Sequence, residues 1–290
     1  MNSLSGHSTL IGHFSGEVIS YACRNTICWQ CKLNPDKEHD CKQNHRGSSK
    51  SMGSDMAVQM ILRNDLLVEL NCRIKTVIGD DDAAYLSALK KLSPYAIEKW
   101  SDFNHVKKTF NSKLWDMKLT ANLREYFSKM FALAIRPNKG EEIKVKIALQ
   151  SIVPHAFGDH ELCGDYCKTD ENGVHVYKHS KNGQCLIDVG LKEKLMKIIQ
   201  PYINNSKQIS PCASSRANES SNNTVCSEHS NTNFHGGSES HSFRVAAAVC
   251  QKNLGYEYII SLNPILELSP GEHSKIHRKK SKETLLTSKK

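Results

Sequence analysis

The sequence predicts an α/β fold, and three observations support that prediction. Two short extended segments open the chain, at residues 8–14 and 17–23, and a serine–glycine turn separates them. An apolar stretch with helical spacing follows at 54–72. A run rich in β-branched residues at 74–78 then predicts a buried strand. This order is typical of α/β proteins, whose open sheets place their sites at the carboxyl ends of strands.

Three consecutive aspartates follow the last of these strands. Gly79 ends the strand, Asp80 occupies its carboxyl end, and Asp82 is placed to cap a helix that runs to residue 92. The three carboxylates repel one another, and a helix N-terminus offsets only part of that repulsion. One interpretation is a Mg²⁺ or Mn²⁺ site, because hard cations prefer carboxylate oxygen. The other is a helix cap with solvated neighbours, since Asp is common in first turns.

The rest of the chain is predicted to be mainly helical. A short strand follows Pro94 at 96–100, and the pattern from 104 to 153 is helical with two breaks. Two more helices are predicted at 189–203 and 243–253.

These elements divide the chain into four parts. The first is a core with a Cys-rich loop at 23–47, and the second is a helical insertion with a Cys/His cluster at 155–167. The third contains the C-terminal helices of the core, and the fourth is a basic tail that we expect to be disordered. The four parts span residues 1–103, 104–203, 204–270 and 271–290.

Composition limits the classes of function. The chain has 39 Lys and Arg against 30 Asp and Glu, a net charge of +9, which suits nucleic acid but also fits a protein with a basic tail. No stretch resembles a signal peptide or a membrane span, so we expect an intracellular protein with no membrane partner. The sequence has no phosphate-binding loop and no nucleophile elbow, so ATP hydrolysis and serine esterase chemistry are unsupported.

Eleven cysteines in a reducing compartment favour metal binding over disulfides. Two groups of residues have the ligand types of tetrahedral zinc. The first group is Cys28, Cys31, His39 and Cys41. The second group, within thirteen residues, is His155, His160, Cys163 and Cys167. Cys23 competes as a fourth ligand of the first site, and the alternative for both groups is unliganded thiols on loops.

A second pair of polar residues lies after the strand at 96–100. Asp102 and His105 are spaced i and i+3, so they are neighbours on one helix face. They are candidates for a catalytic cleft. The alternative is an N-cap aspartate followed by an ordinary surface histidine.

A further acid, Glu219, lies in a segment whose composition is ambiguous. About half of residues 204–232 are Ser or Asn, which indicates a linker with a solvated glutamate. If instead a helix capped near Ser214 or Ser215 forms here, Glu219 could point into a cleft. Candidate phosphate contacts beside it are Arg216 and Lys252.

Seven sequence blocks occur in the same order as in one protein family. They are "SLSGHSTLIG", "HDCKQNHRGSSKSM", "IGDDD", "KWSDFNHVKK", "IVPHAFGDHELCGDYC", "SSRANESSNNTV" and "HGGSESHSFRVAAAVCQKN". Together they resemble the Mutator-like transposase domain of eukaryotic DNA transposons. The resemblance runs from residue 2 to residue 270, and the last three blocks are long and unusual, which makes it specific.

The resemblance implies an RNase H-like mixed sheet with a mainly helical insertion and zinc-binding loops. It also implies the acidic triad of cut-and-paste transposases, in which three carboxylates hold two Mg²⁺ or Mn²⁺ ions that activate water and then a DNA 3′-hydroxyl. Asp80 matches the second acid and Glu219 the third. Asp102 and His105 match a Cys-x-x-His motif in which Asp here replaces Cys. The other residues assigned to the cleft or to DNA contact are Asp82, Lys107, Lys108, Arg216 and Lys252.

The sequence departs from the family pattern at its start. The family's first acid lies in an Asp-Gly-Thr/Ser-Trp block upstream of the segment that matches "SLSG", whereas this chain begins at Met1. We therefore expect the first strand and the first acid to be missing, and the two-metal site to be incomplete. The first acid present is Glu17, which is placed near a turn rather than in a first strand.

The leading hypothesis is a transposon-derived protein of DDE-type transposase ancestry that is incomplete for strand cleavage. Its partner would be double-stranded DNA at transposon ends, and a homo-oligomer is compatible with that role. The resemblance implies a nuclear location, with a basic segment at 277–282 as an import signal. One alternative is a zinc-stabilised DNA-binding or regulatory protein without catalysis, and another is a protein-interaction scaffold.

Overall fold

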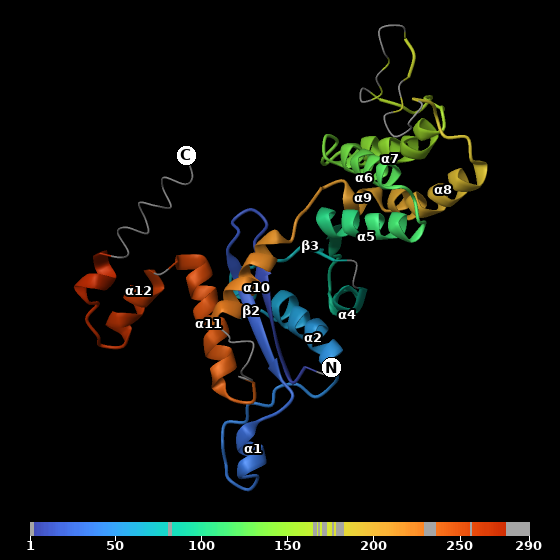
Figure 1. The fold of residues 1–290 in the computed structure, drawn as a ribbon. Coiled ribbons are helices and arrows are strands. Elements are labelled where there is room, and N and C mark those ends of the chain that lie inside the picture. The colour runs from blue at the N-terminus through green and yellow to red at the C-terminus, as the bar shows by residue number, and fades with distance from the viewer. Residues whose placement is uncertain are drawn as a thin grey trace. The chain divides into compact units, whose positions relative to one another are not determined.

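The chain folds into two compact units (Figure 1). A computed structural model describes residues 3–80, 83–164, 167, 169, 173–175, 177, 183–228, 236–255 and 257–276. The first unit comprises residues 1–73, 84–94 and 216–290. The second comprises residues 74–83 and 95–215.

An antiparallel hairpin forms the sheet of the first unit. Strand β1 (Ser5–Ile11) pairs with β2 (Val18–Asn25), and Thr9 lies opposite Tyr21. Gly16 in the connecting turn has a φ of 71°, a conformation that glycine adopts without steric cost. An isolated two-stranded hairpin is marginally stable in water, so this one depends on the helices that cover it.

Helix α2 (Ser49–Leu62) covers one side of the hairpin. Met52, Met56 and Met60 recur every four residues and pack on Ala22 of β2. Residues at this spacing share one helix face, and unbranched methionine side chains adapt to an irregular surface.

The helix predicted over 54–72 is two helices in the structure. The side chain of Asn64 accepts a hydrogen bond from the N–H of Leu67 at 3.3 Å and caps α3 (Asp65–Glu69). Because Asn is a strong N-cap, it starts a new helix where apolar spacing alone indicates one continuous helix.

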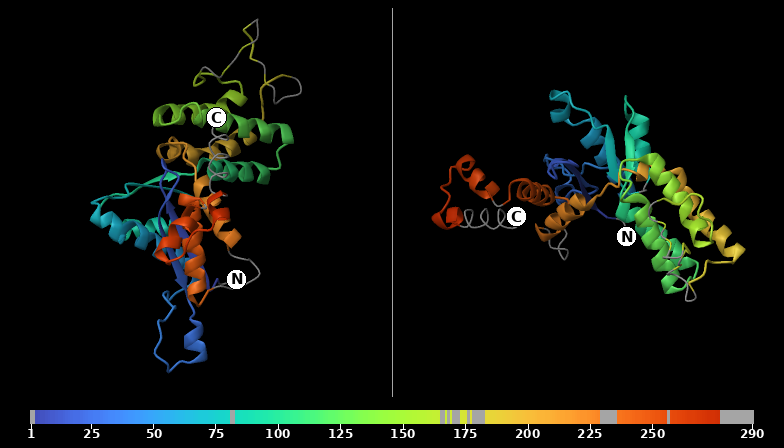
Figure 2. Two further views of the ribbon diagram at one scale, coloured as in Figure 1. Left: turned by 90° about the vertical axis from the view of Figure 1, so that its left-hand side faces the viewer. Right: turned by 90° about the horizontal axis from the view of Figure 1, so that it is seen from above.

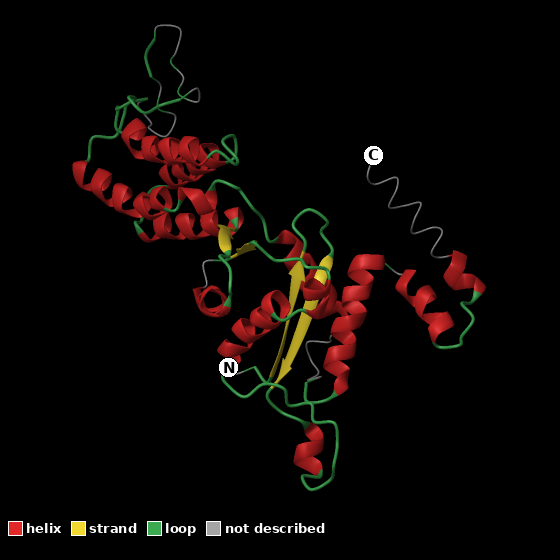
Figure 3. Ribbon diagram, turned by 180° about the vertical axis from the view of Figure 1, so that it is seen from behind, coloured by secondary structure: helices red, strands yellow, loops and turns green. Residues whose placement is uncertain are grey.

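Two helices from the C-terminal part of the chain complete the first unit. Helix α10 (Arg216–Glu228) packs on α11 (Glu239–Leu254) through Val225 and Val245, which are buried. Figures 1 and 3 show α2 on one side of the hairpin and α11 on the other. The remaining elements grouped with this unit are α1 (Trp29–Leu33), α4 (Ala83–Leu92) and α12 (Glu257–Ile265).

Helix α11 is also joined to the hairpin by hydrogen bonds. The side-chain amide of Asn253 accepts from the N–H of Val18 at 2.8 Å and donates to the carbonyl of Val18 at 2.9 Å. Near the other end of the helix, Nε2 of His241 lies 3.3 Å from the carbonyl oxygen of Gly6. Both contacts join residues about 235 positions apart in the sequence.

The second unit contains a parallel pair of strands. Strand β3 (Thr76–Gly79) lies beside β4 (Glu98–Ser101), with Thr76 opposite Glu98. Because parallel strands end at the same edge of a sheet, Asp80 and Asp102 follow the two strands at that edge.

The rest of the second unit is a group of packed helices, coloured green to orange in Figure 2. They are α5 (Phe103–Asp116), α6 (Ala121–Ile135), α7 (Glu142–Ala156), α8 (Val189–Asn204) and the short α9 (Ser206–Ile209). The rings of Phe110 and Phe131 stack with centroids 4.3 Å apart, and Tyr202 packs edge-on against both. These aromatic contacts join α5, α6 and α8 in one core.

The expectation of a mixed α/β chain with a largely helical middle is confirmed. The segment 204–232, whose composition indicates a linker, contains α9 and α10 instead. Of the predicted tail, residues 272–276 are helical and residues 277–290 lie outside the described part of the chain. Among the residues that the structure describes, no helix has the length and apolar character needed to cross a membrane.

Replacing Phe131 by Ala is expected to destabilise the helical unit. Phe131 is fully buried between two other rings, so the change should lower the free energy of unfolding by about 3–5 kcal/mol. Urea unfolding followed by circular dichroism measures the loss. Leu133→Ala on the same helix is the control, because Leu133 is 49% exposed. Equal effects of the two changes would contradict this description of the core.

Candidate metal centres and acidic site

The first Cys/His group comes together at the end of β2. The ligand atoms of all four residues lie within 4.8 Å of one another. Nε2 of His39 lies 3.2 Å from Sγ of Cys31 and 3.5 Å from Sγ of Cys28, and the Sγ atoms of Cys31 and Cys41 are 3.4 Å apart. Zinc bonds of about 2.0–2.3 Å in a tetrahedron put the ligand atoms about 3.3–3.8 Å from one another. The separations in this group are close to those values. The four residues therefore fit one zinc ion.

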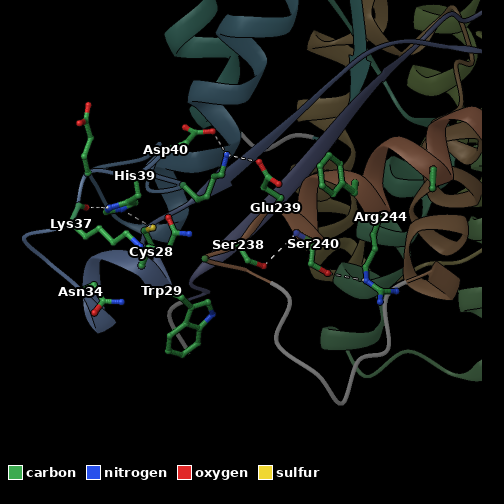
Figure 4. A pocket seen from close by; sticks show the side chains of 16 residues that line it. Cys28, Trp29, Asn34, Lys37, His39, Asp40, Ser238, Glu239, Ser240 and Arg244 are labelled. Atoms are coloured by element: carbon green, nitrogen blue, oxygen red, sulfur yellow. Dashed lines mark hydrogen bonds and ion pairs between the residues drawn. The ribbon is translucent and has the colours of Figure 1, made fainter. Parts of the chain in front are cut away.

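The ring of His39 is oriented for metal binding (Figure 4). Its Nδ1 lies 2.8 Å from the carbonyl oxygen of Lys37. A proton on Nδ1 donates to that carbonyl and leaves the Nε2 lone pair directed at the thiols. This arrangement, in which the other ring nitrogen bonds a backbone carbonyl, is usual for histidine ligands of metals.

The thiols of this group are unequal in acidity. Burial opposes ionisation of Cys28, but backbone N–H groups, including those of Cys31 and Lys42, lower its pKa to about 6. The hydrogen bond with Cys41, together with burial, raises the pKa of Cys31 to about 11. One thiolate therefore forms readily, and binding of a divalent ion would displace the remaining thiol protons.

Cys23, the alternative ligand of this site, lies elsewhere. It is half-buried on β2 and packs against the Val225–Val245 contact of α10 and α11. Burial raises the pKa of its thiol to about 11. The group of ligand atoms that the structure brings together does not include it.

The second Cys/His group forms where α7 ends. His155 lies in the last turn of α7, and its Nδ1 is 3.2 Å from Sγ of Cys163. Nδ1 of His160 is 3.2 Å from Sγ of Cys167. The ligand atoms of these four residues also lie within 4.8 Å of one another, so they too fit one zinc ion. Gly158 makes the turn between the two histidines with a φ of 87°.

A tyrosine that sequence reasoning missed orients His160. Nε2 of His160 lies 2.6 Å from the hydroxyl of Tyr177. If Nδ1 binds a metal, Nε2 carries the proton and donates it to this oxygen. His160 also stacks on His175 at a centroid distance of 3.5 Å. Burial, with the nearby His175, lowers the pKa of His160 and favours the neutral ring that metals require.

The predicted acids are distributed over both units. Asp80 and His105, both in the second unit, are brought together: Nδ1 of His105 lies 3.2 Å from Oδ1 of Asp80, and both side chains are about half exposed. Glu219 is exposed in the first turn of α10 and belongs to the first unit. Asp82 lies outside the described residues.

Asp102 is the N-cap aspartate that the alternative interpretation of the sequence gave, and it makes a second contact that its spacing does not reveal. Asp102 is only 3% exposed. Its carboxylate accepts one hydrogen bond from the N–H of His105 at 2.8 Å and another from the N–H of Ser215 at 2.5 Å. The first contact caps α5, and the second joins β4 to the residue just before α10. Burial alone would raise the pKa of Asp102, but these backbone N–H groups lower it below the ordinary value of 3.8.

A comparison with known families covers much of this part of the chain. The model of the Mutator-like transposase family matches residues 1–168, which include β3, Asp80, Asp102 and both Cys/His groups. The chain belongs to the Mutator-like transposase family. No curated protein and no solved structure gives a match.

The four basic residues assigned to DNA contact in this transposase domain lie on helices of both units. Lys107 and Lys108 are on α5, and Arg216 begins α10. Lys252 on α11 donates to the hydroxyl of Ser220 at 3.1 Å, so it reaches the turn of α10 that carries Glu219.

The block "HDCKQNHRGSSKSM" leads from the first Cys/His group of the transposase domain into α2. His45 is buried and lies 2.9 Å from the hydroxyl of Ser51, and Arg24 donates to Asp55 at 2.5 Å. Arg24 is buried too, and the hydrogen bond and charge of its guanidinium, against the effect of burial, lower the pKa of Asp55. A buried arginine needs such a partner.

Replacing Tyr177 by Phe is expected to weaken zinc binding at the second group. Removing the hydroxyl that accepts from His160 should lower zinc affinity about 10–100-fold, because such partners fix the ligand ring. Competition with a chromophoric chelator measures both sites in one protein, and the first group is the internal control. Unchanged affinity at the second group would contradict the role assigned to Tyr177.

Replacing Asp102 by Asn is expected to destabilise the second unit by about 1–3 kcal/mol at pH 7, because one charged hydrogen bond is lost. The folded-state pKa of Asp102 is depressed, so its contribution is present above the unfolded-state value and is lost as the pH falls through the folded-state value. The difference between wild type and variant should therefore shrink in urea unfolding below pH 3.8. Asp116→Asn, on the exposed end of α5, is the control. A difference that does not depend on pH would contradict the assignment.

Proposed function

We propose that this chain is a transposon-derived domain with an RNase H-like core, and that its ancestral chemistry is two-metal DNA cleavage and strand transfer. The observation that carries the proposal is Asp80 at the carboxyl end of a strand in a parallel pair, with His105 at 3.2 Å. Ligand sites in α/β sheets lie at such ends. The family match covers the same residues.

We assign the metal-binding carboxylates to Asp80 and Glu219. Both are exposed and so accessible to a hydrated ion, unlike Asp102, whose oxygens accept backbone hydrogen bonds. Mg²⁺ or Mn²⁺, when bound, supplies a Lewis acid that activates the attacking oxygen and stabilises the leaving one. A carboxylate has two oxygens, so Asp80 can contact His105 through one and a cation through the other.

We propose that the chain is incomplete for strand cleavage, because only two acids of the triad are assigned in it. The acid nearest the start of the chain, Glu17, lies in the turn that joins β1 and β2, where its backbone carbonyl accepts from Gly12 at 2.9 Å. Its side chain is exposed at a hairpin end and not on a strand. The triad implied by the family resemblance needs a third carboxylate besides Asp80 and Glu219, and Glu17 in the hairpin turn is not placed to supply it.

The partner in this proposal is double-stranded DNA, and the location is the nucleus. A net charge of +9 favours binding to phosphate, and the four basic residues assigned to DNA contact lie on helices of both units. The alternative is a zinc-stabilised DNA-binding or regulatory protein without catalysis. It is supported by the two Cys/His groups, whose ligand atoms are already close together.

A nicking assay with Mn²⁺ and transposon-end DNA tests these proposals. For the wild-type chain we expect no cleavage above background, and DNA binding that weakens steeply as salt increases. Asp80→Asn and Glu219→Gln should leave the binding unchanged, because neither residue is assigned to phosphate contact. Lys107→Ala/Lys108→Ala should weaken binding and reduce its salt dependence.

Each other outcome contradicts a named part of the proposal. Strong cleavage that either acid variant abolishes would overturn the incompleteness and support the two acids. Strong cleavage that neither variant changes would overturn the assignment of Asp80 and Glu219. Failure to bind duplex DNA at low salt would remove both the catalytic proposal and its alternative.

A further inference from the structure

The residue that follows the first zinc ligand reaches a distant part of the chain. Trp29 comes directly after Cys28 and donates two hydrogen bonds across more than 200 residues. Its backbone N–H donates to the carbonyl of Gly237 at 2.9 Å, and its indole N–H donates to the carbonyl of Gly236 at 3.0 Å. The two glycines precede Ser238, the N-cap of α11, so Trp29 fastens the start of that helix to the metal loop. Figure 4 shows Trp29 beside Cys28 in this region.

The glycine pair is shaped for this contact. Gly237 has a φ of 80°, which a residue with a side chain rarely adopts. A Cβ at this position would lie 3.1 Å from Cδ1 of Trp29 and 3.2 Å from its Nε1. Close approach of the indole therefore requires glycine here, which gives a physical reason for the unusual block "HGGSES".

The other end of the metal loop makes a second contact with α11. Lys42 comes directly after Cys41, and its ammonium lies 2.7 Å from Oε1 of Glu239 in the first turn of α11. Lys42 also pairs with Asp40. Both ends of the Cys28–Cys41 loop thus contact the same helix end, and side chains of both line a pocket of about 980 Å³.

The loop has little apolar packing of its own to order it without a metal. Helix α1 within it has five residues and none is buried, and a helix of this length is unstable by itself. The Cys/His group is the point at which the loop closes on itself. Zinc binding energy at such a site is folding energy for the loop.

We propose that metal binding at the first Cys/His group anchors the N-terminal end of α11 to the hairpin, through Trp29 and Lys42. This inference goes beyond the proposed function, since it concerns neither DNA nor cleavage. It predicts a local effect. The far end of α11 is held separately, by Asn253 on Val18, while His241 in the first turn contacts Gly6. Loss of the metal should therefore loosen residues 236–240 and leave the end of the helix in place.

Hydrogen exchange followed by mass spectrometry, on the zinc-loaded full chain, tests the proposal. Cys41→Ser should remove the first zinc and speed exchange of the Trp29 amide and of residues 236–240 at least about tenfold, because the N–H of Trp29 loses its acceptor on Gly237 and the released start of α11 opens locally. Exchange near residues 248–254 should change little. Cys163→Ser, which removes a ligand of the second group in the other unit, is the matched control and should leave residues 236–240 unchanged.

Two further variants separate the anchor from general unfolding of the loop. Trp29→Phe removes the indole donor but keeps an aromatic ring, and Gly237→Ala blocks its approach. Both should retain two zinc ions and still speed exchange at residues 236–240. The proposal is overturned if Cys41→Ser loses its zinc while exchange at these residues is unchanged. It is equally overturned if Trp29→Phe and Gly237→Ala both exchange like wild type.

Discussion

The carboxylate of Asp102 is the constraint that joins the strand pair of the second unit to the helix and chain segment beside it. One buried group caps α5, which carries His105, and also holds the backbone at Ser215, one residue before α10 and its Glu219. Because a buried carboxylate must be hydrogen-bonded, losing either donor would leave charge without compensation. This single side chain therefore fixes where β4 ends, where α5 begins and where the chain leaves toward α10.

The two Cys/His groups lie in long connecting segments, where a bound metal ion would stabilise the loop. The first closes the loop that leaves β2, and the second closes the segment after α7. Among the described residues of these segments no large apolar core is present, so bound metal would replace burial as the source of order. In each group a histidine is also hydrogen-bonded to an atom that is not a metal ligand. The partner is the carbonyl of Lys37 for His39 and the hydroxyl of Tyr177 for His160.

Local patterns predicted much of the architecture. The β-branched run before Gly79, the Cys and His spacings and the long apolar periodicity all correspond to elements in the structure. The failures occurred where a helix cap or a tertiary packing contact overrides periodicity or composition. Asn64 divides one predicted helix into two by capping the second, and the Ser- and Asn-rich segment forms α10 because its helix packs on α11 through Val225. Such decisions depend on partners that composition does not show.

The sequence by itself determined the family, the mixed α/β character, the metal-ligand sets and the candidate acids, because residue type and short-range spacing carry that information. Only the tertiary structure decided that His105 faces Asp80 while Asp102 bonds the backbone. It alone excluded Cys23 from the first metal group and joined Trp29 to the Gly236–Gly237 pair. These contacts join residues 25 to more than 200 positions apart, and folding in three dimensions, rather than local propensity, brings such residues together.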